Sequence, residues 1–171
     1  MLGQETTTQI GNPIVPDALP HHLRPITFAA TELLLDLIYL IQSFCQTDLE
    51  SILILLCVTD ASMHPFMLDP STPPEIMDAE RPPDEVRGAI SRRMVSDKTG
   101  LPRETVRRKS MELAAAGFLL IDDQDRLRIA QDLGNPAFQR TVEGGHLAVL
   151  RYLERLHALG VDWKNVPVGK P

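Results

Sequence analysis

The segment from Arg87 to Leu120 constrains the fold of this chain more than any other stretch. It reads as a short apolar strand at Ala89–Ile90, a short helix, a glycine at Gly100, and a longer arginine-rich helix that Gly117 ends. Ser91 has the side chain of a helix N-cap, and the two glycines permit the left-handed backbone that closes a helix. The pattern therefore predicts two helices joined by a tight turn.

The expected helices cover residues 92–99 and 102–116, with Pro102 at the first helical position. Residues 118–121 and 126–130 alternate as strands around a polar turn of three aspartates, which predicts a hairpin directly after the second helix. The residues expected to face the core of this unit are Met94, Val95, Leu101, Val106, Leu113, Ala114 and Ala116.

Positive charge is concentrated in the same segment. Residues 87–109 contain eight Lys or Arg residues and only Asp97 and Glu104 as acids, so their formal charge is +6. The whole chain carries −6, which leaves −12 on everything else. A compact basic segment in an acidic protein favours contact with a polyanion, made by one local surface.

The remaining sequence divides into flanking parts. Residues 1–26 contain scattered prolines and are expected to be an extended arm, whereas residues 27–46 are strongly apolar and predict a helix. Its apolar residues cover more than one face, so we expect burial at a dimer interface. Residues 131–171 predict a C-terminal helix and a short tail, with Gly144-Gly145 breaking or bending the helix.

Between these flanks, residues 47–130 form the central unit. Thr47 to Glu50 match a capping box, in which Thr47 accepts from first-turn amides and Glu50 reaches back, and this starts a helix through about Ser62. Residues 63–86 are an acidic insertion rich in proline, and regular structure is not expected there. The insertion is either a partner-binding segment or a tolerated surface loop.

Several classes of function find little support. Cys45 and Cys57 lie in apolar runs without metal-ligand spacing, and the scattered histidines form no zinc motif. Neither a phosphate-binding glycine loop nor a nucleophile with a local base is recognisable, so we expect no enzyme activity, cofactor or metal. Asp36, Asp48 and Glu50 interrupt the apolar stretch 33–58, and no signal peptide opens the chain. We therefore expect a cytoplasmic, bacterial protein.

From Asp48 to Ala130 the sequence resembles the winged helix-turn-helix of MarR- and GntR-type bacterial transcription regulators. The matching stretches are Gly88–Ser91, Met94–Val95, Gly100–Leu101, Arg103–Arg107, Leu113 and Gly117–Leu119. The resemblance implies a mainly α fold with a short β-hairpin wing and flanking helices that dimerise. It also implies a recognition helix, about residues 102–116, in the major groove of a two-fold DNA site.

The sequence departs from this pattern in three places. Lys109 and Ser110 stand where such helices often place an apolar residue, the wing tip is acidic, and the insertion 63–86 is not typical. An acidic tip repels phosphate, so contact by the wing would fall to Arg126 and Arg128.

Arg103 and Arg107 are the candidates for base edges, because a guanidinium can bridge two acceptors of guanine. Thr105 suits either a base or a phosphate. The candidates for phosphate contact are Arg92, Arg93, Lys98, Arg108 and Lys109.

Two other interpretations stay open. One is a solvated helix face with pairs such as Glu104–Arg108. The other is a winged-helix module that binds protein through the acidic insertion, without binding DNA. The expected partners are double-stranded DNA and a second copy of the chain, without a membrane. The leucine-rich terminal helices indicate dimer core rather than an effector pocket.

Overall fold

The computed structural model describes residues 22–162. Most of the arm expected at 1–26 and most of the tail expected from Val161 lie outside this range, and residues 23–26 are the first turn of a helix rather than part of an extended arm. The described part is mainly helical, with one small antiparallel sheet of three strands. The elements in chain order are α1 (Leu23–Cys45), α2 (Leu49–Met67), α3 (Pro74–Met77), β1 (Ile90–Ser91), α4 (Arg92–Thr99), α5 (Arg103–Ala115), β2 (Leu119–Ile121), β3 (Arg126–Ile129) and α6 (Pro136–Ala158).

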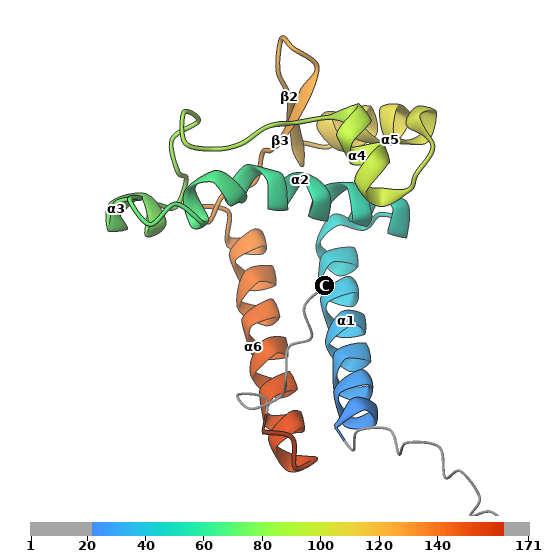
Figure 1. Ribbon diagram of the computed structural model, residues 1–171. Helices are drawn as coiled ribbons and strands as arrows, with labels where there is room; N and C mark the ends of the chain where they lie inside the picture. Colours follow the sequence, from blue (N-terminus) through green and yellow to red (C-terminus); the bar gives the residue numbers. More distant parts are fainter. Residues whose placement is uncertain (1–21, 163–171) are drawn as a thin grey trace, which may run out of the picture.

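Helix α2 lies across the middle of the molecule. Helices α1 and α6 run side by side and antiparallel on one side of α2, while α4, α5 and the hairpin lie on the other side (Figure 1). Phe44 near the end of α1 connects the two parts, because its ring is 5.6 Å from that of Phe118 and 5.7 Å from that of Phe138.

The main core surrounds α2 and joins it to α4, α5 and the sheet. Ile54 and Val58 of α2, Val95 of α4, Val106 of α5 and Leu127 of β3 are all fully buried in it. Burial of such aliphatic side chains is worth about 1.5–3 kcal/mol each, so this cluster fixes how α4 and α5 sit on α2.

The sheet has the strand order β1-β3-β2. Ile90 pairs with Leu127, and Leu119 pairs with Ile129, which places alternate apolar residues toward α2. The expected hairpin is thus confirmed, and Asp125 takes the positive φ of 58° that its tight turn needs.

The structure corrects the expected limits of the second helix. The N-cap of α2 is Asp48, whose carboxylate accepts from Ser51 N at 3.0 Å, and not Thr47. The helix also continues past Ser62 to Met67 through Pro65. The Gly88 amide donates to Ser62 O at 3.1 Å, so a tertiary hydrogen bond joins the end of the insertion to α2 in the turn that contains the proline. A short helix, α3, forms within the insertion.

The C-terminal helix is also not broken at its glycine pair, since α6 runs from Pro136 to Ala158. A Cβ on Gly144 would lie 2.8 Å from a methyl carbon of Leu40. The glycine therefore allows α6 and α1 to pack closely, which is its structural role.

Helices α1 and α2 are both long and apolar enough to span a membrane by length and composition alone. Helix α1 contains two acids that form ion pairs with α6. Glu32 pairs with Arg155 at 3.3 Å, and Asp36 pairs with Arg151 at 3.0 Å. Much of α2 is buried in the protein core. Both helices thus have protein neighbours in this fold.

Candidate nucleic-acid interface

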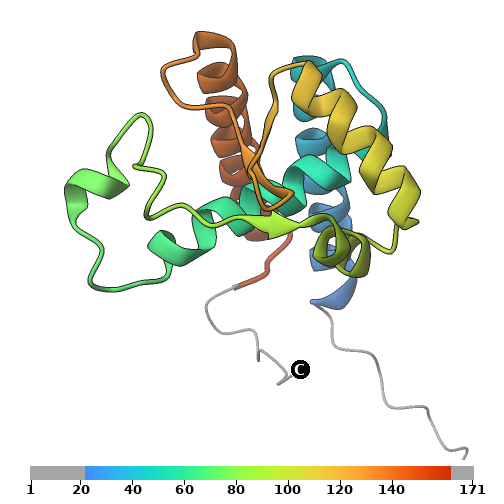
Figure 2. The ribbon, with the colours of Figure 1, turned by 90° about the horizontal axis from the view of Figure 1, so that it is seen from above.

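Helices α4 and α5 form a compact pair on the side of α2 away from α1 and α6 (Figure 2). Ser91 caps α4 by accepting from Met94 N at 3.3 Å, and Gly100 ends the helix with φ 72°. Helix α5 begins one residue after Pro102. Two helices joined by a tight turn, as the sequence predicts, are therefore present at these residues.

Two residues expected in the core of this unit are exposed. Met94 is 53% exposed while its neighbour Val95 is fully buried, because consecutive residues of one short helix point in different directions. Ala116 is exposed as well, since it lies beyond the last turn of α5. Leu101 is half-buried against the core, as expected.

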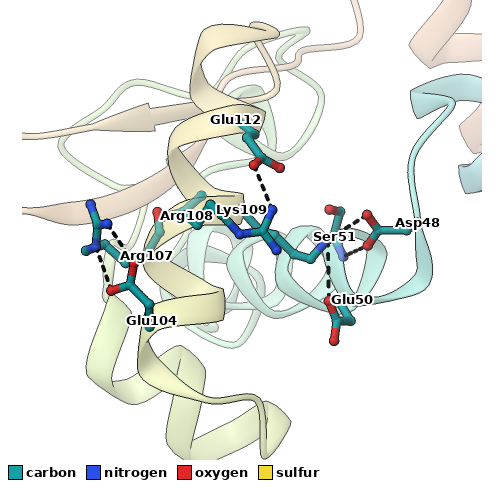
Figure 3. A network of polar contacts seen from close by, with 9 residues as sticks. Asp48, Glu50, Ser51, Glu104, Arg107, Arg108, Lys109 and Glu112 are labelled. Carbon is teal, nitrogen blue, oxygen red and sulfur yellow. Dashed lines mark hydrogen bonds and ion pairs between the residues drawn. The ribbon is translucent and has the colours of Figure 1, made fainter.

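The outer face of α5 carries three exposed arginines. The Arg107 guanidinium makes two hydrogen bonds to Glu104, at 2.6 and 2.9 Å, which lower the pKa of that carboxyl. Arg108 pairs with Glu112 at 2.8 Å. Arg103 is exposed and makes no ion pair with any residue in 22–162. Figure 3 shows the two paired arginines on α5.

These pairings differ from the expected one. Glu104 pairs with Arg107 at three-residue spacing and not with Arg108, which turns instead to Glu112. Both spacings bring side chains together on a helix. The four-residue spacing between Arg108 and Glu112 could have indicated this pair, but the sequence-based hypothesis assigned no role to Glu112.

Lys109 is not placed to contact phosphate, which corrects that expectation. Its side chain is 6% exposed and lies between α5 and α2, where Nζ is 2.5 Å from Asp48 Oδ2 and 3.4 Å from Glu50 Oε2 (Figure 3). Ser110 beside it is fully buried. Lys109 and Ser110, which depart from the apolar pattern of the family, therefore lie on the inner face of α5 and have polar partners there.

Arg92 is likewise engaged within the protein. Its Nε donates to Ser110 Oγ at 2.9 Å, and its Nη1 contacts the Asp125 carboxylate at the hairpin tip. The side chain is only 18% exposed. Arg92 thus connects α4, α5 and the hairpin, and the expected phosphate contact at this residue is also corrected.

The other candidates vary in how accessible they are. Arg93 is 75% exposed and lies 3.9 Å from Asp97, while Lys98 pairs with Asp60 of α2 at 3.3 Å. Arg126 of the hairpin pairs with Asp122 at 2.9 Å. Arg128 donates to Asp84 O at 3.3 Å, and its Nε is buried without a hydrogen-bond partner among the described residues. Thr105 is half-buried.

The basic segment is therefore largely neutralised in the folded protein. Within 87–109, Arg103 is the one Lys or Arg that has no carboxylate partner in the described part of the chain. The pairs that neutralise the segment from outside it are Arg87–Asp84, Arg92–Asp125, Lys98–Asp60, Arg108–Glu112, Lys109–Asp48 and Lys109–Glu50. The formal charge of +6 along the sequence does not become a free patch of that size.

Residues 22–162 contain no group of three or more His, Cys, Asp or Glu side chains that could hold a metal ion. Comparison of the chain with protein-family models, with curated proteins and with solved structures finds no match.

Proposed function

We propose that this protein is a cytoplasmic, bacterial transcription regulator that binds double-stranded DNA through a winged helix-turn-helix, with α5 as the recognition helix. The carrying observation is the outer face of α5. Val106 and Leu113 hold the helix to the core, while Arg103, Arg107 and Arg108 are exposed on the part of its surface that leaves the core. A helix held by one face and basic on the other suits a groove lined by phosphates.

The ion pairs on this face oppose DNA binding only weakly. Exposed pairs at three- or four-residue spacing on a helix stabilise by about 0.3–0.5 kcal/mol. A charge-assisted hydrogen bond to phosphate or a bidentate contact to guanine is worth about 1–3 kcal/mol. Arg107 and Arg108 can therefore exchange their glutamates for DNA, whereas buried Lys109 would have to leave the core.

The proposed contact set is smaller than the sequence suggested. Arg103 and Arg107 are assigned to base edges, because they lie in the first two turns of α5. Arg93 and Arg108 are assigned to phosphates. Arg92 and Lys109 are assigned to holding the helices in place.

The proposal includes a homodimer formed through α1 and α6. Leu34, Leu35 and Tyr39 on the outer face of α1 are 57%, 61% and 71% exposed. Glu32 and Asp36, which pair with arginines of α6, are 41% and 44% exposed and border this face. A second copy would cover this face and place two α5 helices on a two-fold site.

The test is fluorescence polarisation of the whole chain on DNA selected from a random pool, repeated over a salt series. We expect the logarithm of the binding constant to fall steeply and linearly with the logarithm of salt. An Arg103→Ala/Arg107→Ala variant should bind at least about tenfold more weakly than the wild type.

Arg140→Ala is the matched control, because it removes an exposed arginine that makes no ion pair with the described residues and lies on α6. It should bind like the wild type. Absence of binding at low salt would instead favour a winged-helix module that binds protein through its acidic insertion. Light scattering of a Leu35→Glu variant tests the dimer, since a charge on that face should yield monomers.

A further inference from the structure

A cavity of about 200 Å³ lies between the end of α2, the insertion and the beginning of α6. Three methionines line it, Met63, Met67 and Met77, together with the rings of Phe66 and Phe138. Methionine side chains are flexible and polarisable and adapt to the shape of an apolar guest. The cavity is separate from the outer face of α5, and the proposed DNA contacts do not use it.

One polar group of the lining is unusual. The Arg87 side chain is 5% exposed, pairs with Asp84 at 3.2 Å, and donates through Nη2 to the carbonyl oxygen of Ile129. A guanidinium has five N–H donors. The two contacts leave further donors of Arg87 without a partner among the described residues, and Arg87 is one of the residues that line the cavity.

The charges around the cavity decide what kind of acceptor fits. Asp84 neutralises Arg87 and also lies 3.6 Å from Arg81, which in turn is 3.8 Å from Asp132. Glu80 completes the ionisable lining. The arginines thus carry no surplus positive charge, and a carboxylate guest would face the two acids of the lining, Glu80 and Asp132, with Asp84 close to Arg87. An uncharged guest meets no such repulsion.

We propose that this cavity binds a small uncharged aromatic molecule with a single carbonyl or hydroxyl oxygen that accepts from Arg87. The volume sets the size, since an enclosed apolar cavity of about 150 Å³ takes benzene and this partly open one of about 200 Å³ has room for roughly nine non-hydrogen atoms. This binding site goes beyond the DNA-binding proposal and does not depend on it.

The test uses acetophenone as the probe, with the whole chain labelled with ¹³C at its methionine methyl groups. We expect saturable shifts of the Met63, Met67 and Met77 signals, with a Kd below about 1 mM. Met94 and Met111 are internal controls, because they lie on α4 and α5 away from the cavity. Benzoate matches acetophenone in size but is anionic, and it should bind at least about tenfold more weakly.

A pair of variants locates the binding. Val142 lines the cavity, whereas Val149 lies on the same helix outside it, and both are about equally exposed, at 45% and 41%. Val142→Phe should weaken acetophenone binding at least about tenfold, and Val149→Phe should leave it unchanged. Equal shifts of these three signals and the two control signals, unsaturable shifts, or wild-type affinity in Val142→Phe would overturn the proposal. The acetophenone titration contains no DNA, so its failure would not count against the proposed DNA binding.

Discussion

The ammonium group of Lys109 lies 2.5 Å from a carboxylate oxygen of Asp48, and this pair joins the middle of α5 to the first turn of α2. The same carboxylate accepts from Ser51 N at 3.0 Å and so caps α2. One aspartate therefore caps the beginning of the central helix, α2, and helps to set how α5 is rotated about its own axis. That rotation decides which arginines of α5 face solvent.

Replacing Lys109 by methionine should leave DNA binding and its salt dependence unchanged. The variant should also lose less than about 2 kcal/mol of unfolding free energy, because Asp48 and Glu50 are 56% and 50% exposed and stay solvated without the lysine. Urea denaturation and polarisation measure the two effects. Arg108→Gln is the comparison, and it should lower the salt slope by about 1. The same drop in Lys109→Met would show that the lysine contacts phosphate.

The Asp48 carboxyl should make stability depend on acid pH. Its hydrogen bonds to Lys109 and Ser51 lower its pKa from 3.8 to about 2. A carboxyl with a lowered pKa stabilises the fold above its unfolded pKa and loses that contribution as pH falls through the folded one. The stability advantage of the wild type over Asp48→Asn should therefore be full above about pH 5 and shrink between about pH 4 and pH 2. Urea denaturation over this range measures it, and a constant difference would contradict the assignment.

Neutralising Glu104 should strengthen DNA binding about 2- to 5-fold. Glu104→Gln removes the ion pair that holds Arg107 and also removes a negative charge from the proposed interface. The measurement is polarisation at one fixed salt concentration. Glu154→Gln, on the exposed side of α6, makes the same chemical change away from α5 and should bind like the wild type. Equal affinity of the two variants would argue against Arg107 as a DNA contact.

Alanine at two glycines should have opposite effects on stability. A Cβ on Gly88 would lie 2.1 Å from the Ala61 carbonyl oxygen, which is backbone and cannot turn away. Gly88→Ala should therefore cost more than about 2 kcal/mol of unfolding free energy. A Cβ on Gly145 meets Leu37 at an ordinary 3.6 Å, so Gly145→Ala should stabilise α6 by about 0.5–1 kcal/mol. Urea denaturation of both variants tests the pair.

Local signals predicted the elements around the interface closely. Ser91, Gly100 and Gly117 lie where the helices begin and end, since caps and left-handed turns depend on a few neighbouring residues. Periodicity identified Val106 and Leu113 as core residues, because the 3.6-residue repeat fixes one face of a long helix. The same rule failed for Met94, which lies on a helix too short to define a face.

Contacts between distant segments were not visible in the sequence. Nothing near Lys109 indicates that Asp48, sixty-one residues earlier, is its partner. Nothing near Pro65 indicates that Gly88, from the far end of the insertion, donates to Ser62 O in the same turn of α2. Lysine and proline each have a strong local preference, for solvent and for a helix end, and neither preference is followed in the fold.

Apart from the short helix α3, the order of helices and strands was determined by the sequence alone, because hydrophobic period, helix caps and glycine turns act within a few residues. Only the tertiary structure decided how much of the positive charge stays accessible. Charge adds along a chain without regard to position, whereas ion pairing depends on distance in space, and the carboxylates of α2, the insertion and the hairpin tip approach the basic helices only after folding.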